Sequence, residues 1–421
     1  MKASIDKSKI TGKVSAPPSK SYTIRGVMCA AMAKGESEII NPLGSDDTDA
    51  CLDVLSKVGI SVLQNKDSWQ VNGGDFQEPE VDLFCRESAA TLRFMTAVCS
   101  IIPGPCRLTS APSLTRRPIK PLLQALRQLG VDCFSQDEYA RVVINGGKLK
   151  GGITELMGNI SSQFISALLH VAPFADEAIT IRLTTPLESQ PFVLMTMECL
   201  KTFGVRVESS KDLREFRITK QAYKPAKYQV EGDWSSASYL LALGALCGEV
   251  EVENLNPESL QGDKAILDFL EDMGASVTVG NSSITVARSD LKAISANLSD
   301  CIDLLPTVAV LAATANGVSE FTGIERARLK ESNRVSAVTE GLEGMGIKVI
   351  EEKNKLSITG SPAKGTVIDT QGDHRIAMAF SLLGLRYGGT TIDGAECVSK
   401  TYPEFWSTLK RTGGEVKIDG K

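Results

Sequence analysis

The chain has 421 residues, of which 42% are hydrophobic and 23% charged, and 46 basic against 51 acidic residues give a net charge of −5. This length predicts more than one hydrophobic core and therefore two or three domains. The acidic balance argues against a nucleic-acid-binding protein, which needs a basic surface. No apolar run reaches the roughly 18 residues of a transmembrane helix, and the first residues lack the apolar segment of a signal peptide. We therefore expect a cytoplasmic protein that binds neither nucleic acid nor membrane.

The ten cysteines are scattered along the chain, with no Cys-x-x-Cys pair and no neighbouring histidine. This pattern argues against a structural zinc site and against a disulfide framework. Neither a G-x-x-x-x-G-K-[ST] loop nor a strand–GxGxxG–helix motif is present, so a nucleotide cofactor is not expected. We predict reduced, mostly buried thiols, no metal and no cofactor.

A unit of about seventy residues repeats six times along the chain. Its first part is an apolar helix rich in small residues, which we expect to begin near Lys20, Ser88, Ser161, Trp234, Asp303 and Asp373. Most copies open with Ser or Asp, which cap helices well, and end near Gly. A short strand, an amphipathic helix ending at Gly and further strands follow. The repeat therefore reads strand–helix–strand–helix–strand–strand.

The six repeats divide into two groups of three, with the change expected within residues 225–232, PAKYQVEG. We predict one domain over residues 14–228 and a second from residues 1–13 and 229–421. The first helix of each repeat is apolar on nearly all faces, so it should lie inside, with the sheets packed outside it. Two similar halves should leave a cleft between them for ligands.

Basic and hydroxyl side chains gather where several of these helices begin. A helix N-terminus attracts anions, whereas Lys or Arg there opposes the helix dipole, so the combination indicates a shared anionic ligand. The acids Asp303 and Glu331 lie among these cations, where a carboxylate stays ionised and can serve as a base. Helix capping is the alternative explanation for Asp303, and a buried ion pair is the alternative for Arg93.

Seven motifs resemble the 5-enolpyruvylshikimate-3-phosphate (EPSP) synthase family. They are PSKSYTIR (18–25), RRPI (116–119), SSQF (161–164), QGD (261–263), LKESNR (329–334), GDHRIAM (372–378) and SKTYPEF (399–405). The resemblance covers essentially the whole chain. It implies an α/β fold of two domains, each with three β-α-β-α-β-β units (an inside-out α/β barrel), and an active site in the interdomain cleft.

The resemblance also implies the reaction and its residues. Enolpyruvyl transfer from phosphoenolpyruvate to the 5-hydroxyl of shikimate 3-phosphate would proceed through a tetrahedral intermediate, in the shikimate pathway to chorismate and the aromatic amino acids. The family works without a cofactor, and we expect a monomer. Asp303 is similar to the family's base, and Glu331 with Lys20 to its proton-transfer groups. Contacts to shikimate 3-phosphate are implied for Lys20, Ser21, Arg25, Ser161, Ser162, Gln163, Ser189, Asp303 and Lys330. Contacts to phosphoenolpyruvate are implied for Lys20, Ala89, Arg117, Gln163, Arg334, Arg375 and Lys400.

Four positions depart from the family pattern. Ala89 stands where the family usually has Gly, and its methyl group leads us to hypothesise reduced sensitivity to glyphosate, which occupies the phosphoenolpyruvate pocket. Phe192 replaces a frequent Tyr, which puts one hydroxyl contact to shikimate in doubt. Asn333 replaces a frequent Asp, and Arg326 and its neighbours do not supply the family's usual asparagine.

Two other functions remain alternatives. The sister transferase that acts on UDP-N-acetylglucosamine has a reactive Cys before its Arg-Pro, whereas PSLTRRPIK (112–120) has none. A non-catalytic paralogue that only binds a phosphorylated metabolite would keep the basic residues and lose the acids, but Asp303 and Glu331 are both present.

Overall fold

The computed structural model describes residues 1–112, 114, 117–135 and 141–420. The chain forms two compact units, here called the first unit (Pro18–Glu231) and the second unit (Met1–Pro17 with Gly232–Lys421). Each unit has its own cluster of buried apolar side chains. These limits lie three to four residues beyond the domain limits expected from the sequence, because the strands β2 (Ile10–Ser15) and β14 (Lys227–Gln229) continue past the expected boundaries.

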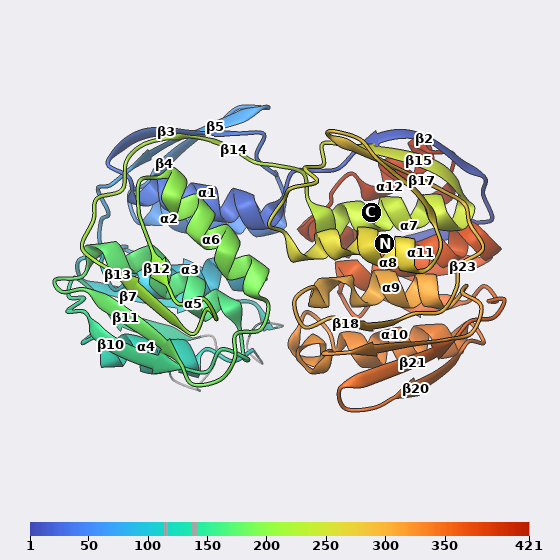
Figure 1. Cartoon of the computed structure of the whole chain (residues 1–421). Coiled ribbons are helices and arrows are strands. Elements are labelled where there is room, and N and C mark those ends of the chain that lie inside the picture. Colours follow the sequence, from blue (N-terminus) through green and yellow to red (C-terminus); the bar gives the residue numbers. More distant parts are fainter. Residues whose placement is uncertain (113, 115–116, 136–140, 421) are drawn as a thin grey trace. The chain divides into compact units, whose positions relative to one another are not determined.

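The first unit contains three repeats and the closing strand β14 (Figure 1). The first repeat has α1 (Lys20–Met32), β3 (Gly35–Ile40), α2 (Asp46–Lys57), β4 (Ser61–Gln64) and β5 (Ser68–Gly73). The second has β6 (Leu83–Phe84), α3 (Ala89–Val98), β7 (Pro105–Thr109), α4 (Lys120–Gln128), β8 (Asp132–Ser135) and β9 (Val142–Asn145). The third has β10 (Gly152–Leu156), α5 (Ser162–Val171), β11 (Ile179–Leu183), α6 (Gln190–Thr202), β12 (Glu208–Ser209) and β13 (Glu215–Ile218).

The second unit begins with β1 (Lys2–Asp6) and β2 and continues with three further repeats. The fourth repeat has α7 (Trp234–Cys247), β15 (Gly248–Glu253), α8 (Ile266–Asp272), β16 (Ser276–Val279) and β17 (Ser283–Ala287). The fifth has β18 (Ser295–Asn297), α9 (Leu305–Ala312), β19 (Val318–Thr322), α10 (Arg334–Gly344), β20 (Lys348–Glu351) and β21 (Lys355–Thr359). The sixth has β22 (Val367–Asp369), α11 (His374–Tyr387), β23 (Thr390–Asp393), α12 (Phe405–Arg411) and β24 (Glu415–Asp419).

Within the described residues the strands form six four-stranded sheets with one shared pattern. In the sheet β10-β11-β13-β12, for example, the first pair is parallel and the other two pairs are antiparallel. Chain ends and linkers complete three of the sheets. Strand β14 returns to pair with β3, β2 pairs with β15, and β1 lies between β23 and β24. Both N-terminal strands therefore belong to the second unit, and each unit closes on itself.

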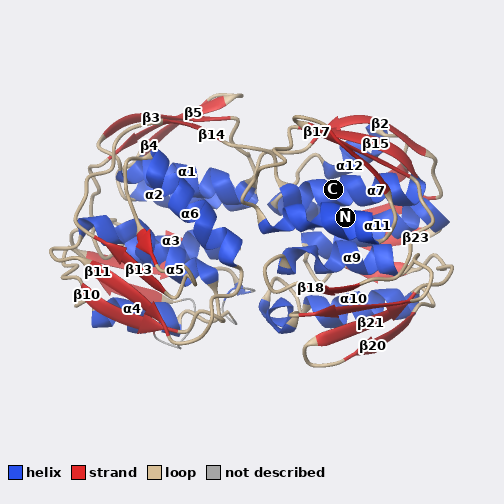
Figure 2. Cartoon of the chain, viewed as in Figure 1, coloured by secondary structure: helices blue, strands red, loops and turns tan. Residues whose placement is uncertain are grey.

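The first helix of every repeat lies inside its unit, as the sequence predicts, with the sheets on the outside (Figure 2). All eight residues of α9 and all but one of the fourteen in α7 are buried. Serine or aspartate side chains cap five of these six helices, which satisfies backbone N–H groups at their starts; the caps are Ser19, Ser88, Ser161, Asp233 and Asp373. The resulting architecture is the expected inside-out α/β fold, with helices at the centre and sheets around them.

The segment expected to link the two halves is largely structured. Residues 227–229 form β14, which packs on α1 where Gly26 leaves room, since a Cβ there would lie 2.7 Å from the Tyr228 ring. Gly232 begins the second unit, and a Cβ on it would lie 1.8 Å from the Asn254 carbonyl oxygen. Only glycine fits the close backbone approach at position 232.

The ten cysteines are all free, and nine of them are buried, as expected. Within the described part of the chain, no group of three or more His, Cys, Asp or Glu side chains is placed to hold a metal ion. Among the same residues, no helix has the length and apolar character needed to cross a bilayer.

Candidate active site

The start of α1 carries three of the predicted substrate-contacting residues, Lys20, Ser21 and Arg25. The Ser19 side chain caps the helix by accepting a hydrogen bond from a backbone N–H in the first turn. Lys20 Nζ lies 3.1 Å from Asp47 Oδ2, near the start of α2. Asp47 is buried, whereas the Lys20 side chain is partly exposed. A buried carboxylate therefore holds the ammonium group in place at this helix start.

Arg25 is a buried guanidinium whose hydrogen bonds go to uncharged acceptors. Its Nη1 donates to the Ser21 carbonyl (3.0 Å), its Nη2 to the Phe192 carbonyl (3.1 Å) and its Nε to Thr196 Oγ1 (2.8 Å). The rings of Phe94 and Phe192 lie 5.4 and 5.7 Å from its Cζ. Burial lowers the pKa of Arg25, and none of the described carboxylates forms an ion pair with it. A buried charge without a counter-charge is costly, so this site favours an anionic ligand.

Arg93 joins two of the predicted binding segments. It is 8% exposed and donates from Nη1 to Ser161 Oγ (3.2 Å) and Gln163 Oε1 (2.7 Å), and from Nη2 to the Pro118 carbonyl (3.4 Å). Ser161 caps α5, and Ser162 is its buried first residue. The sequence offered a buried ion pair as the alternative role for Arg93, and two of its contacts, Ser161 and Gln163, are residues proposed to bind substrate. The feature of the sequence that could have indicated this role is the position of Arg93, a charged residue one turn inside an apolar helix.

Three further predicted residues lie at helix starts or turns of the first unit. Ser189 is buried and precedes α6 with φ +55° and ψ +44°, a left-handed conformation that is uncommon for serine and concentrates at functional sites. Arg117 is 9% exposed and lies in a turn three residues before α4 begins at Lys120. The expectation that it opens this helix is therefore wrong. Arg116 lies outside the described residues. Ala89 is the buried first residue of α3.

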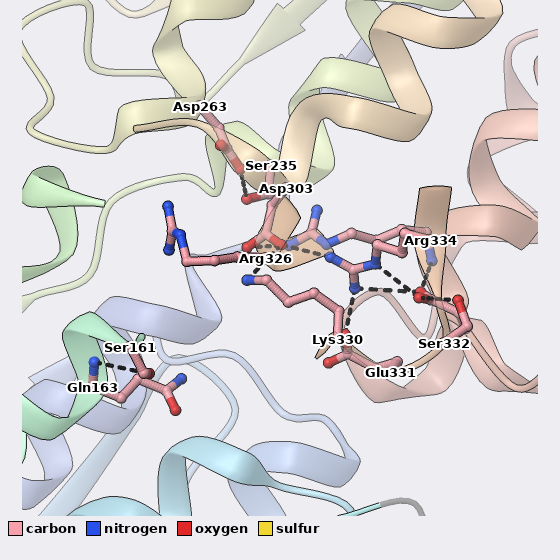
Figure 3. Close-up of polar contacts among 12 residues, drawn as sticks. Ser161, Gln163, Ser235, Asp263, Asp303, Arg326, Lys330, Glu331, Ser332 and Arg334 are labelled. Carbon is pink, nitrogen blue, oxygen red and sulfur yellow. Dashed lines mark hydrogen bonds and ion pairs between the residues drawn. The ribbon is translucent and has the colours of Figure 1, made fainter. Parts of the chain in front are cut away.

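Arg334, the first residue of α10, is the centre of a charge cluster in the second unit (Figure 3). Its Nε donates to Asp373 Oδ2 (2.7 Å), its Nη1 to Asp303 Oδ1 (2.6 Å) and its Nη2 to Glu331. Burial lowers the pKa of Arg334, but the three carboxylates outweigh burial and raise it. The charge of Arg334 at this helix start is therefore offset inside the protein. Unlike Arg25, it does not by itself require an anionic ligand.

Asp303 lies between three cations in the same cluster. Besides Arg334, Lys330 Nζ lies 3.2 Å from its Oδ1 and Arg375 Nη2 lies 3.6 Å from its Oδ2. Burial raises the pKa of Asp303, but the three cations hold it well below its usual value. Burial also lowers the pKa of Lys330 to about 8, although Asp303 opposes this shift. The capping explanation for Asp303 is wrong, because it lies in the 3-10 turn η4 (Ile302–Leu304) and Leu304 precedes α9.

Asp373 connects several parts of this cluster, although it was not among the predicted site residues. It is completely buried and accepts hydrogen bonds from Arg334, from Ser332 Oγ (3.1 Å) and from the backbone N–H of Arg375 (2.9 Å). The feature of the sequence that could have indicated its role is its place as the cap of α11, directly before His374 and Arg375. Lys400 ends the 3-10 segment η6 (Ala395–Lys400) and is also buried.

Three of the residues that depart from the family pattern make hydrogen bonds within their own unit. Asn333 caps α10 by accepting a hydrogen bond from the Ser336 backbone N–H. Phe192 presents its carbonyl and its ring to Arg25. Arg326 donates to the Ser299 carbonyl.

The comparisons with known proteins agree on one family. Residues 5–409 match the model of EPSP synthase (3-phosphoshikimate 1-carboxyvinyltransferase). The 3-phosphoshikimate 1-carboxyvinyltransferase of Dehalococcoides mccartyi is 49% identical over the full length of both chains, and that of Methanothermobacter thermautotrophicus is 42% identical over 99% of this chain and 100% of the relative. The solved structure of EPSP synthase from Acinetobacter baumannii is 26% identical, covers 99% of this chain and 100% of its own, and superposes with a TM-score of 0.84. The chain therefore belongs to the EPSP synthase (3-phosphoshikimate 1-carboxyvinyltransferase) family.

Proposed function

We propose that this protein is the EPSP synthase of its shikimate pathway. It transfers the enolpyruvyl group of phosphoenolpyruvate to the 5-hydroxyl of shikimate 3-phosphate and releases phosphate. The hydroxyl oxygen adds to C2 of phosphoenolpyruvate while C3 gains a proton. The tetrahedral intermediate then loses phosphate and a methyl proton to give the enol ether.

The observation that supports this chemistry best is Asp303 within its three cations. In the free protein Lys330 and Arg375 stabilise the carboxylate and keep it a weak base. Anionic substrates that contact these cations would weaken that stabilisation and raise the basicity of Asp303. The base would therefore become effective when the substrates are bound, which suits removal of the proton from the 5-hydroxyl.

We propose that Glu331 and Lys20 carry the proton transfers at C3. Glu331 pairs with Arg334, and Lys20 pairs with Asp47, so each has a charged neighbour that fixes its side chain. The remaining assignments are also proposals. The shikimate 3-phosphate contacts are Lys20, Ser21, Arg25, Ser161, Ser162, Gln163, Ser189, Asp303 and Lys330. The phosphoenolpyruvate contacts are Lys20, Ala89, Arg117, Gln163, Arg334, Arg375 and Lys400.

Phosphate release from phosphoenolpyruvate tests the proposal. The wild-type protein and an Asp303→Asn variant are assayed with shikimate 3-phosphate, with UDP-N-acetylglucosamine and with neither acceptor. We expect release only with shikimate 3-phosphate, and its loss in the variant while shikimate 3-phosphate still binds. Release only with UDP-N-acetylglucosamine would assign the sister reaction. Binding of shikimate 3-phosphate without release would leave a non-catalytic paralogue.

We also propose that the protein works in the cytoplasm as a monomer. Ten free cysteines, nine of them buried, suit a reducing compartment. Each unit closes its own sheets and buries its own core without a second chain. Sedimentation at micromolar concentration tests the oligomeric state.

A further inference from the structure

The protein accepts hydrogen bonds from three of the five N–H groups of the Arg25 guanidinium, and two N–H groups remain. Nε and Nη2 share one edge of the guanidinium, and this edge is held by Thr196 Oγ1 and the Phe192 carbonyl of α6. Nη1 gives one N–H to the Ser21 carbonyl. One N–H therefore remains on each of Nη1 and Nη2, the two terminal nitrogens of the fork. Two parallel N–H groups of this kind bind a phosphate or carboxylate in bidentate fashion.

Thr196 is suited to hold this guanidinium. Its hydroxyl group can donate to the Phe192 carbonyl (2.9 Å) or to Ser166 Oγ on α5 (2.8 Å). The oxygen accepts the Nε–H of Arg25, and the single hydroxyl proton has both the Phe192 carbonyl and Ser166 Oγ as acceptors. Thr196 is completely buried, so water cannot replace a lost partner.

The contacts close a ring between α1 and α6. Arg25 reaches the Phe192 carbonyl directly through Nη2 and indirectly through Nε and the Thr196 hydroxyl. Without the Thr196 hydroxyl group, the Ser21 and Phe192 carbonyls would still hold Nη1 and Nη2, but Nε would lose its acceptor and the edge that faces α6 would keep one attachment of two. The direction of the two remaining N–H groups therefore depends in part on the hydroxyl group of Thr196.

We propose that Thr196 is a positioning residue that orients Arg25 toward the anionic group of shikimate 3-phosphate. The proposal rests on the proposed function, in which Arg25 contacts that substrate. Thr196 itself does not touch the substrate or the reacting atoms. Without its hydroxyl group, the guanidinium loses one attachment, and binding must restore its orientation at a cost in affinity.

The test compares Thr196→Val with Thr196→Ser and with the control Thr96→Val. Valine keeps the shape of threonine and removes the hydroxyl group, and serine restores that group. Thr96 is an equally buried helical threonine whose hydroxyl also donates four residues back, to the Leu92 carbonyl. It therefore reproduces the loss of a buried hydroxyl group in the same unit without a contact to Arg25.

In Thr196→Val we expect the KM for shikimate 3-phosphate to rise about tenfold, the effect of one hydrogen bond to a charged group. The kcat and the KM for phosphoenolpyruvate should change by less than about threefold. Thr196→Ser should restore most of the affinity, and Thr96→Val should retain it. Equal effects of the two valine variants, or parallel losses in kcat and both KM values, would overturn the proposal.

An Arg25→Met variant separates this inference from the proposed function. If Arg25→Met raises the KM for shikimate 3-phosphate and Thr196→Val does not, Arg25 binds the substrate but Thr196 does not position it. If Arg25→Met leaves that KM unchanged, the proposed contact itself is wrong, and the positioning role fails with it. A rise in both variants, larger in Arg25→Met, supports both.

Discussion

Replacing Asp373 by Asn tests the charge cluster around Arg334. The substitution keeps the shape of the side chain and its capping role, since Asn caps helices about as well as Asp. It removes a charge that lies 2.7 Å from Arg334 Nε, between side chains that are 1% and 0% exposed. Breaking a buried ion pair costs about 3–5 kcal/mol. Because Asp303 and Glu331 still contact Arg334, we expect the lower end, about 3 kcal/mol.

This loss should be visible by calorimetry. The second unit has 207 residues, 17 from the N-terminus and 190 from Gly232 onward. At about 2–4 °C per kcal/mol for this size, the Tm of that unit should fall by about 6–12 °C. Asp233→Asn is the matched control, because Asp233 caps α7 in the same way and acts on a guanidinium, that of Arg375, only as one of several more distant charges rather than through an ion pair among the described residues. A fall below about 2 °C in Asp373→Asn, or an equal fall in the control, would refute the reasoning.

Three shorter predictions concern substrate binding. Burial lowers the pKa of Lys330 to about 8, so the ammonium form is lost as the pH rises through that value. Above it, kcat/KM for shikimate 3-phosphate should fall about tenfold per pH unit. The Lys330→Arg variant, which keeps its charge, should not show this fall. Ala89→Gly should increase inhibition by glyphosate without a large change in the KM for phosphoenolpyruvate, and unchanged inhibition, or the same increase in the neighbouring Ala90→Gly, would contradict the hypothesis. Arg93→Met should raise the KM of both substrates about tenfold, because the cap Ser161 and Gln163 of α5 lose their shared donor. Arg182→Met, an exposed side chain on β11, is the control; KM values equal to those of the control would show that Arg93 positions neither Ser161 nor Gln163.

Local patterns in the sequence predicted the elements and their placement well. The apolar periodicity, the capping Ser or Asp and the terminal Gly of each repeat act within one or two helical turns, so they can be recognised without the fold. They correctly indicated six buried helices, and five of those have the expected side-chain cap. The sixth, α9, follows a 3-10 turn instead, and Asp303 is thereby released from capping to join the charge cluster.

The electrostatic interpretation depended on contacts that no local pattern contains. At the sequence level, Arg25 and Arg334 are equivalent cations near helix starts. In the structure, Arg334 lies among three carboxylates, of which Asp303 and Asp373 come from segments 31 and 39 residues away. Arg25 instead meets uncharged acceptors 167 and 171 residues away. Of the two, only the surroundings of Arg25 leave a buried positive charge that an anion must balance.

The sequence by itself determined the repeat, the buried faces of its helices and, through seven motifs, the family. Those features are set by neighbouring residues and their periodicity. The tertiary structure decided which strands close each unit, which cations are already neutralised and which side chains orient them. These properties arise from contacts between repeats, where the same residue types meet different partners, as Arg25 with Thr196 and Arg334 with Asp373 demonstrate.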